Sequence, residues 1–287
     1  MPAPSPIFLV NPHSGPDGPA AFTAELDRRG LAYFVTESKA AVPTFFATAA
    51  KEHDVIVVCG GDGTVNSILP YAVSTGKAFA VWPNGSGDGF AKELGYGRDL
   101  DALLAAIRRG ETECVDVMQA GSHYAANVVG VGFDSYVARE FAHKEGRGLK
   151  NYVIESTKAY QTFEPIAARV TIDGEVHEGQ YSMITVANTP QFGNNARIAP
   201  RADASDGLVD VVLVRPMPVF MALRFLVEVF AGREDGTRYV SYHRGREVAI
   251  ETDCPHCQVD GETFPFEDER LEVRVAGEAR WVVMGAS

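Results

Sequence analysis

Apolar and polar residues are arranged in two different ways along this chain. In the first 120 residues, short apolar runs alternate with segments whose apolar residues recur every three or four positions. The runs predict strands and the segments predict helices, and such an alternation is typical of a parallel sheet with helical crossovers. The expected strands are 7–10, 32–35, 55–58, 78–82 and 114–118, and the expected helices are 19–29, 43–52, 65–74, 90–94 and 100–109.

From about residue 122 the pattern changes to short extended segments, which predict an antiparallel β-sandwich. An Asp173-Gly174 turn predicts a hairpin between 168–172 and 175–180. We therefore expect an α/β domain with a parallel sheet over 1–121 and a β-rich domain over 122–287, with a return of the last residues to the first domain left open. The other expected strands are 181–187, 208–214, 246–251, 271–275 and 280–284, and the expected helices are 134–144, 152–163 and 218–231.

The composition indicates a soluble globular protein, since 46% of the 287 residues are hydrophobic and 22% are charged. A formal charge of −12 argues against nucleic-acid binding and against a membrane contact driven by overall charge. No secretory signal is visible, and the most apolar segment, 219–232, is interrupted by Arg224 and Glu228. We favour ordinary core as the role of its apolar stripe, with the lining of an apolar groove as the alternative. We expect a cytoplasmic protein.

Four cysteines do not make a disulfide framework in a chain of this length. Only Cys254 and Cys257 are closely spaced, in a Cys-Pro-His-Cys segment that has no second half of a zinc site. A turn with two free thiols is therefore favoured, and zinc binding stays an alternative.

The most informative segment is GGDGTVN at 60–66, which follows an apolar strand and opens a helix. Its glycines let the backbone approach a ligand, and the amides at a helix N-terminus favour phosphate. Asp62 lies inside this turn, where a plain anion site would avoid negative charge, so a cation or a substrate hydroxyl is expected beside the phosphate. The segment predicts phosphoryl transfer.

Two further loops, 11–15 and 84–89, also follow predicted strands and carry small polar residues. Loops at the carboxyl ends of parallel strands meet at one edge of the sheet, so the three loops are expected to converge. The Walker signature and the GxGxxG spacing are both absent, which excludes a standard P-loop enzyme and a Rossmann dehydrogenase.

These motifs resemble those of the diacylglycerol kinase catalytic-domain family, which includes bacterial lipid kinases and sphingosine and ceramide kinases. The resemblance covers nearly the whole chain and implies a first domain like those of phosphofructokinase and NAD kinase. It also implies that ATP is bound by the three loops and by a threonine that ends the second strand. The implied nucleotide-binding residues are Asn11, Pro12, Ser14, Gly15, Thr36, Gly60, Gly61, Asp62, Gly63, Thr64, Asn66, Gly85, Ser86 and Asp88.

The second half carries further family motifs. The segment N-x-x-G-x-G-F-D at 127–134 matches the start of the lipid domain, and 187–188 with 192–193 and Pro200 resembles a family strand and loop. The DG-x-x-D pattern at 206–210 implies a structural Mg²⁺ held by the carboxylate of Asp206 and by carbonyl groups near Asp203 and Leu208.

The late DGE motif at 260–262 carries the implied catalytic base. We favour Glu262 as the base with Asp260 in support, although carboxylates two positions apart on a strand would share a face and the sequence does not separate them. Asp62 is expected to orient the metal or to activate the hydroxyl. Without the resemblance, the same three residues are equally well explained as a hairpin turn.

One departure from the family concerns the third loop, where Asp88-Gly89-Phe90-Ala91 replaces the Asn-Asp-Phe-Ala of many diacylglycerol-type members. Gly89 removes an acid from the expected metal network, and Asp88 offers a carboxylate one position earlier. The substrate class is less certain for that reason.

The expected function is an ATP- and Mg²⁺-dependent lipid kinase that phosphorylates a hydroxyl of diacylglycerol, a sphingoid base or a related lipid at the membrane surface. A peripheral contact at the inner membrane face and a homodimer are left open. The alternatives are an NAD kinase-like enzyme and a catalytically weak protein that binds lipid or nucleotide.

Overall fold

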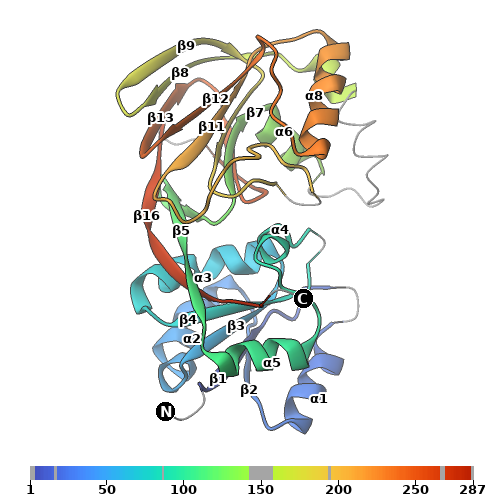
Figure 1. Ribbon diagram of the computed structural model, residues 1–287, viewed down its shortest axis with the longest axis vertical. Helices are drawn as coiled ribbons and strands as arrows, with labels where there is room; N and C mark the ends of the chain where they lie inside the picture. The colour runs from blue at the N-terminus through green and yellow to red at the C-terminus, as the bar shows by residue number, and fades with distance from the viewer. Residues whose placement is uncertain are drawn as a thin grey trace. The chain divides into compact units, whose positions relative to one another are not determined.

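The computed structural model describes residues 4–15, 18–85, 87–141, 158–192, 195–265 and 269–285. The chain divides into two compact units, Met1–Val117 with Ala276–Ser287, and Met118–Val275 (Figure 1). The sequence pattern places a boundary between residues 121 and 122, in the turn that joins strands β5 (Thr112–Ala120) and β6 (His123–Ala125).

A parallel sheet forms the centre of the first unit, and this confirms the α/β architecture predicted for the N-terminal half. The strands β1 (Pro6–Val10), β2 (Ala32–Val35), β3 (Val55–Gly60) and β4 (Ala78–Pro83) lie in the order β2-β1-β3-β4 and are all parallel. All six residues of β3 are buried, because helices cover both faces of such a sheet, and its sequence therefore reads as one apolar run.

One helix of the first unit follows local capping rules at both ends. In α5 (Leu100–Arg109) the side chain of Asp99 accepts a hydrogen bond from the amide of Ala102, and Gly110 ends the helix with φ 72°. The other helices are α1 (Ala20–Arg28), α2 (Val42–Ala47), α3 (Asp62–Thr75) and α4 (Gly89–Glu93), with short 3₁₀ helices at Lys39–Ala41 and Ala49–Glu52.

The single helix predicted for 43–52 is wrong. The backbone of Thr48 leaves the helical region at φ −123° and ψ −92°, and the chain continues as a 3₁₀ helix. The hydroxyl of Thr48 donates to the carbonyl of Thr44 at 2.6 Å, a local bond that competes with regular helix geometry.

The C-terminal end of the chain packs in the first unit. The last residues of β16 (Arg270–Val282) run parallel to β4, with Trp281 opposite Phe79. The indole of Trp281 is fully buried and meets the ring of Phe90 edge-on at 4.7 Å, and the hydroxyl of Tyr96 donates to the carbonyl of Val282 at 2.7 Å. These contacts fix the end of the chain beside α4.

The second unit contains two antiparallel sheets, as the sequence predicts. The first has the order β12-β11-β10-β7-β14-β15. Its strands are β7 (Val128–Gly132), β10 (Met183–Ala187), β11 (Val209–Val214), β12 (Val240–Gly245), β14 (His256–Val259) and β15 (Glu262–Pro265). The second is formed by β8 (Ile166–Ile172), β9 (Glu175–Tyr181), β13 (Glu247–Thr252) and the first residues of β16.

Both faces of the six-stranded sheet are buried. Along β11, Val211 and Leu213 belong to the core that also contains Val170 of β8 and Ile250 of β13, while Val212 faces the opposite side. That opposite side is covered by α6 (Phe133–Phe141) and α8 (Val219–Ala231) (Figure 1). Because successive side chains of a strand point to opposite faces, alternate residues of β11 belong to two different cores.

The Asp173-Gly174 hairpin is confirmed, with Ile172 opposite Glu175 and φ values of 46° and 90° at the two turn residues. Residues 158–162 are helical, whereas 142–144 and 152–157 of the predicted helices lie outside the described residues. None of the helices in the described part of the chain is both long and apolar enough to cross a membrane.

Candidate functional site

The three polar loops of the first unit converge, as predicted. The side-chain amide of Asn11 donates to the hydroxyl of Thr64 at 2.8 Å, and that of Asn84 donates to the carbonyl of Ser14 at 2.7 Å. The first loop follows β1, the second β3 and the third β4, which are neighbours in the sheet. The shared edge therefore brings together polar groups that lie up to seventy residues apart in sequence.

The second and third loops approach so closely that they exclude side chains. A Cβ atom on Gly85 would lie 2.6 Å from the Cα of Gly61 and 2.6 Å from a carboxylate oxygen of Asp88. A real Cβ atom does not come this close to a non-bonded neighbour, so this crossing requires glycine. Where the two loops cross, a ligand would therefore meet bare backbone.

Asp62 is the first residue of α3, so the helix begins three residues earlier than the sequence pattern predicted. Its carboxylate accepts hydrogen bonds from the amides of Gly89 at 3.1 Å and Phe90 at 3.2 Å. These amides open α4 and have no partner in a preceding turn. The charge of Asp62 is thus balanced by backbone donors, and each oxygen keeps a second lone pair for a metal or a hydroxyl.

Asp88 lies beside Asp62 in the third loop and is buried. Its Oδ1 accepts a hydrogen bond from the amide of Gly85 at 2.8 Å. Burial raises the pKa of the Asp88 carboxyl; the bond from Gly85 opposes this shift, and the charge of Asp62 adds to it. The loop is fixed from outside by Lys92 and Arg98, which donate to the carbonyls of residues 87 and 83 at 2.6 and 2.8 Å.

The remaining nucleotide-binding candidates have different surroundings. Thr36 is buried at the end of β2, and its hydroxyl donates to the carbonyl of Val10, the residue before Asn11, at 3.4 Å. Pro12 and Gly15 belong to the first loop, Gly60 ends β3, and Gly63 and Asn66 lie in the first turns of α3. Ser86 lies outside the described residues.

In the second unit, Asp260 and Gly261 form the two-residue turn of a hairpin, with φ values of 48° and 85°. Val259 lies opposite Glu262 across this turn. The expectation that Asp260 and Glu262 share one face of a strand is wrong, because Asp260 is not on a strand. The turn thus places Asp260 at the tip of the hairpin and Glu262 at the start of β15.

The carboxylate of Asp260 is occupied by backbone donors. It accepts hydrogen bonds from the amides of Ala126, Asn127 and Val128 at 2.8, 2.9 and 3.0 Å. The amide of Asp260 returns a bond to the carbonyl of Val128 at 2.9 Å. Three amides on one carboxylate stabilise its charged form and anchor the turn to the start of β7, so Asp260 acts as a structural clamp.

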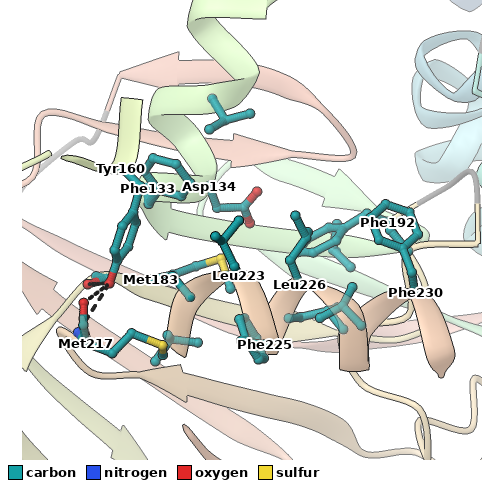
Figure 2. Close-up of a pocket in the computed structure, with 18 of the residues that line it drawn as sticks. Phe133, Asp134, Tyr160, Met183, Phe192, Met217, Leu223, Phe225, Leu226 and Phe230 are labelled. Atoms are coloured by element: carbon teal, nitrogen blue, oxygen red, sulfur yellow. Dashed lines mark hydrogen bonds between the residues drawn. The ribbon is translucent and has the colours of Figure 1, made fainter. Parts of the chain in front are cut away.

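An apolar cavity of about 310 Å³ lies in the second unit, on the face of the six-stranded sheet that carries α6 and α8 (Figure 2). Much of the apolar stripe of 219–230 lines this cavity, which supports the alternative interpretation of the stripe as a groove lining, while Val229 also belongs to the core. The aromatic and aliphatic lining includes Phe133, Val137, Tyr160, Met183, Phe192, Ile198, Met217, Leu223, Phe225, Leu226 and Phe230.

The cavity has a small polar end. Asp134 of α6 accepts hydrogen bonds from the side chains of Gln258 at 3.0 Å and Thr185 at 3.5 Å, and Gln258 in turn accepts one from the amide of Gly261 at 2.8 Å. Asp134, Gln258 and Gly261 all line the cavity, with Asp134 opposite Leu223 of α8 (Figure 2). Burial raises the pKa of Asp134 to about 6, although both side-chain bonds oppose the shift.

This polar end explains part of the 127–134 motif. A Cβ atom on Gly130 would lie 1.8 Å from the carboxylate oxygen of Asp134, so only glycine lets that side chain lie across β7. Gln258 and Tyr160 were missed by the sequence reasoning. The signal for Gln258 was a lone amide within an apolar strand, a position that requires hydrogen-bond partners.

The DG-x-x-D segment does not fit a bound metal ion as it is arranged. Asp206 forms an ion pair with Arg244, and the guanidinium also lies 3.4 Å from a carboxylate oxygen of Asp210. The other oxygen of Asp206 accepts the amide of Leu208 at 3.0 Å, and Asp203 accepts from Ser205. The cation between these acids is an arginine of the chain.

Within the part of the chain that the structure describes, no three or more histidine, cysteine or acidic side chains are grouped so that they could hold a metal ion. Cys254 and Cys257 are both buried in the core between the two sheets, and the thiol of Cys254 donates to the carbonyl of His256 at 3.3 Å. The two thiols thus lie among apolar neighbours.

Comparison with known proteins gives matches over nearly the whole chain. Residues 5–120 match the diacylglycerol kinase catalytic domain, and residues 127–277 match the YegS C-terminal NAD kinase beta sandwich-like domain. A diacylglycerol kinase of Mycobacterium tuberculosis is 28% identical over 221 residues, which are 74% of this chain and 71% of that protein.

A diacylglycerol kinase of Bacillus subtilis is 23% identical over 75% of this chain and 73% of its own length. The crystal structure of a diacylglycerol kinase from Bacillus anthracis superposes with a TM-score of 0.71 at 19% identity, covering 99% of this chain and 98% of that one. At this level of identity the superposition concerns the fold alone.

Proposed function

Since the chain belongs to the diacylglycerol kinase catalytic-domain family and is a kinase, we propose that it uses ATP and Mg²⁺ to phosphorylate a hydroxyl of diacylglycerol, a sphingoid base or a related lipid. The first unit binds the nucleotide, and the second unit binds the lipid and supplies the base. The observation that carries the proposal is the apolar cavity, whose polar end reaches the turn before Glu262.

Nucleotide binding rests on the three converging loops. The amides of Asp62 and Gly63 open a 14-residue helix, and such amides bind phosphate oxygens with the support of the helix dipole. The contact of Gly61 with Gly85 keeps the crossing of the second and third loops free of side chains. We assign Asn11, Ser14, Gly15, Gly60, Thr64, Gly85 and Asp88 to this site, with Thr36, Pro12, Asn66 and Ser86 in support.

The donor set of these loops suits the magnesium ion that accompanies a nucleotide. Mg²⁺ in kinases is held by one or two carboxylates together with the phosphates of the substrate, and the loops offer Asp62 and Asp88. When bound, the ion neutralises charge that develops on the transferred phosphoryl group. Asp62 is held in one orientation by the two amides of α4, so it loses little freedom in the reaction.

Lipid binding rests on the cavity in the second unit. Its lining is almost entirely apolar, and its few polar groups gather around Asp134, Gln258 and Gly261. A site with that division suits a ligand with an apolar body and one polar end. The acyl or alkyl chain lies between α8 and the sheet, and the hydroxyl lies near Gly261.

Glu262 is the proposed catalytic base. It follows Gly261 directly in the chain, so its backbone lies at the polar end of the cavity. Asp260 is the poorer candidate because its carboxylate already accepts three amides. We assign Glu262 to remove the proton of the lipid hydroxyl, and Asp260 to hold the turn.

The test is a kinase assay on purified protein with ATP, Mg²⁺ and a panel of lipids in mixed micelles, with mass detection of the phosphorylated product. NAD is included in the same panel. Phosphate transfer to one class of lipid is the expected result. Transfer to NAD alone would replace the proposal by an NAD kinase activity, and lipid binding without transfer would leave only a binding protein.

A further inference from the structure

The outward face of α8 is apolar. Phe220, Leu223 and Val227 are 68, 41 and 62% exposed, and their spacing of three and four residues puts them on one side of the helix. Arg224, also exposed, lies within the same row. These four residues form what we call the outward stripe.

A helix that packs one face on a sheet normally presents polar residues on the other face. Here α8 packs Val229 into the core and lines the cavity with Leu226 and Phe230, so it is apolar on its inner side as well. Among the described residues, three of the five large apolar side chains that are exposed belong to this one helix. The stripe is therefore a concentrated feature of the surface, and it marks an interaction site.

The stripe is continuous with the cavity. Leu223 is exposed on the surface and also lines the cavity, and Val219 and Ala222 line the cavity one position before Phe220 and Leu223. Leu223 therefore joins the lining of the cavity to the outward stripe.

The charges near the stripe also favour one kind of partner. Arg224 is the cation of the stripe, and the acid of α8, Glu228, is paired with Arg233 at 3.2 Å. The chain as a whole carries a formal charge of −12, which disfavours contact with an anionic surface elsewhere. An apolar helix face with an arginine suits the boundary between the headgroups and acyl chains of a bilayer.

We propose that the outward stripe of α8 is the membrane-docking surface of this protein, and that it sets the mouth of the cavity against the bilayer. The partner is a lipid surface with anionic headgroups. Phe220 and Val227 enter the acyl boundary, and Arg224 meets the headgroups. This inference rests on the proposed function, because docking would bring the cavity to its lipid substrate. Docking is nevertheless measured separately from catalysis.

The experiment measures flotation of the full-length protein with vesicles of phosphatidylcholine, alone or with phosphatidylglycerol. The test variant combines Phe220→Gln with Val227→Gln, since glutamine keeps helix propensity and neither residue lines the cavity. We expect its partition coefficient to fall by about tenfold or more on both vesicles, because two apolar side chains no longer leave water. Arg224→Gln should weaken binding to the anionic vesicles only.

The matched control is Val176→Gln, which changes an apolar side chain of the same unit that is 43% exposed on β9. It should bind vesicles like the wild type. Equal binding by the double variant and the wild type would overturn the proposal, as would equal losses in the double variant and the control. A wild type that floats with neither vesicle also overturns it.

Two further measurements distinguish membrane docking from self-association and from a defect in catalysis. Sedimentation equilibrium of the wild type and double variant reports whether the stripe is covered by a second copy of the chain; a dimer that the double variant loses contradicts membrane docking. Turnover of a short-chain, water-soluble diacylglycerol should be the same in both proteins. If neither protein phosphorylates any lipid but the wild type still floats through the stripe, the proposed function fails while the docking surface stands.

Discussion

The carboxylate of Asp62 accepts a hydrogen bond from the amide of Gly89 at 3.1 Å. The acid in the glycine-rich turn therefore has a backbone partner in the neighbouring loop. The second bond, from the amide of the next residue, completes a fixed orientation for the side chain. Gly89, which replaces an acid in the third loop, thus donates its amide directly to Asp62 of the glycine-rich turn.

We expect Asp62→Asn to reduce lipid kinase activity by about 100-fold or more, because the substitution removes a carboxylate assigned to the magnesium ion that neutralises the phosphates. An asparagine accepts only one of the two amide bonds, so the free energy of unfolding should also fall by about 1 kcal/mol. Steady-state rates and urea unfolding measure the two effects. Asp101→Asn, at an exposed carboxylate of the same unit, is the control and should change neither quantity by much. Full activity in Asp62→Asn would refute the assigned site.

Glu262→Gln should mainly lower the activity, whereas Asp260→Asn should mainly lower the stability. Glu262→Gln removes the proposed base and should abolish turnover while the melting temperature stays near that of the wild type. Asp260→Asn replaces a carboxylate that accepts hydrogen bonds from three backbone amides. Because an asparagine cannot accept all three, the free energy of unfolding should fall by about 2 kcal/mol. Rapid turnover by Glu262→Gln, or an unchanged stability in Asp260→Asn, would contradict the separate roles given to the two acids.

Gly130→Ala tests the position of Asp134. The added methyl group would overlap the carboxylate of Asp134, so the side chain must move and its bond to Gln258 is lost. A loss of about 1 to 3 kcal/mol in unfolding free energy is expected. Gly179→Ala is the matched control, since a Cβ on that strand glycine finds only ordinary contacts at 3.9 Å or more. Equal stabilities of the two variants would argue against the crowding at Gly130.

Asp134 should make stability depend on pH. Its pKa is raised from 3.8 to about 6, so the folded protein holds a proton that the unfolded chain has lost between these values. Stability should therefore fall as the pH rises from about 4 to about 6 and stay low above it. Asp134→Asn lacks this contribution. Urea unfolding of both proteins across that range should give a difference that changes by about 2 kcal/mol, and parallel curves would contradict the assignment.

The pairing of Arg244 with Asp206 and Asp210 predicts that the wild type needs no metal ion for stability. Chelation with EDTA should leave its melting temperature unchanged. Arg244→Gln leaves the two acids without their cation, so its stability should fall by about 1 kcal/mol and should rise again on addition of Mg²⁺. Arg270→Gln, which breaks exposed pairs with Glu251 and Glu272, is a control that should gain nothing from Mg²⁺. A wild type that melts earlier in EDTA would show that the segment binds a metal.

Local patterns in the sequence determined much of the fold. The all-buried run of β3 and the Asp173-Gly174 turn each specify one structure, because burial on both faces and positive φ values are properties of a few adjacent residues. The three polar loops were also predictable, since each directly follows a strand of one parallel sheet. The break at Thr48 was not, because it depends on a side-chain bond that competes with the helix.

The sequence by itself thus determined the two architectures, the edge of the sheet where polar loops meet, and the family to which its motifs point. Only the tertiary structure decided the hydrogen-bond and ion-pair partners of particular polar side chains. Asp260 and Glu262 were indistinguishable until the hairpin turned one carboxylate toward three amides of a distant strand. The hydrogen bonds of Asp62, the cation beside Asp206 and the cavity under α8 likewise depend on partners far along the chain. A local periodic pattern does not specify such long-range contacts.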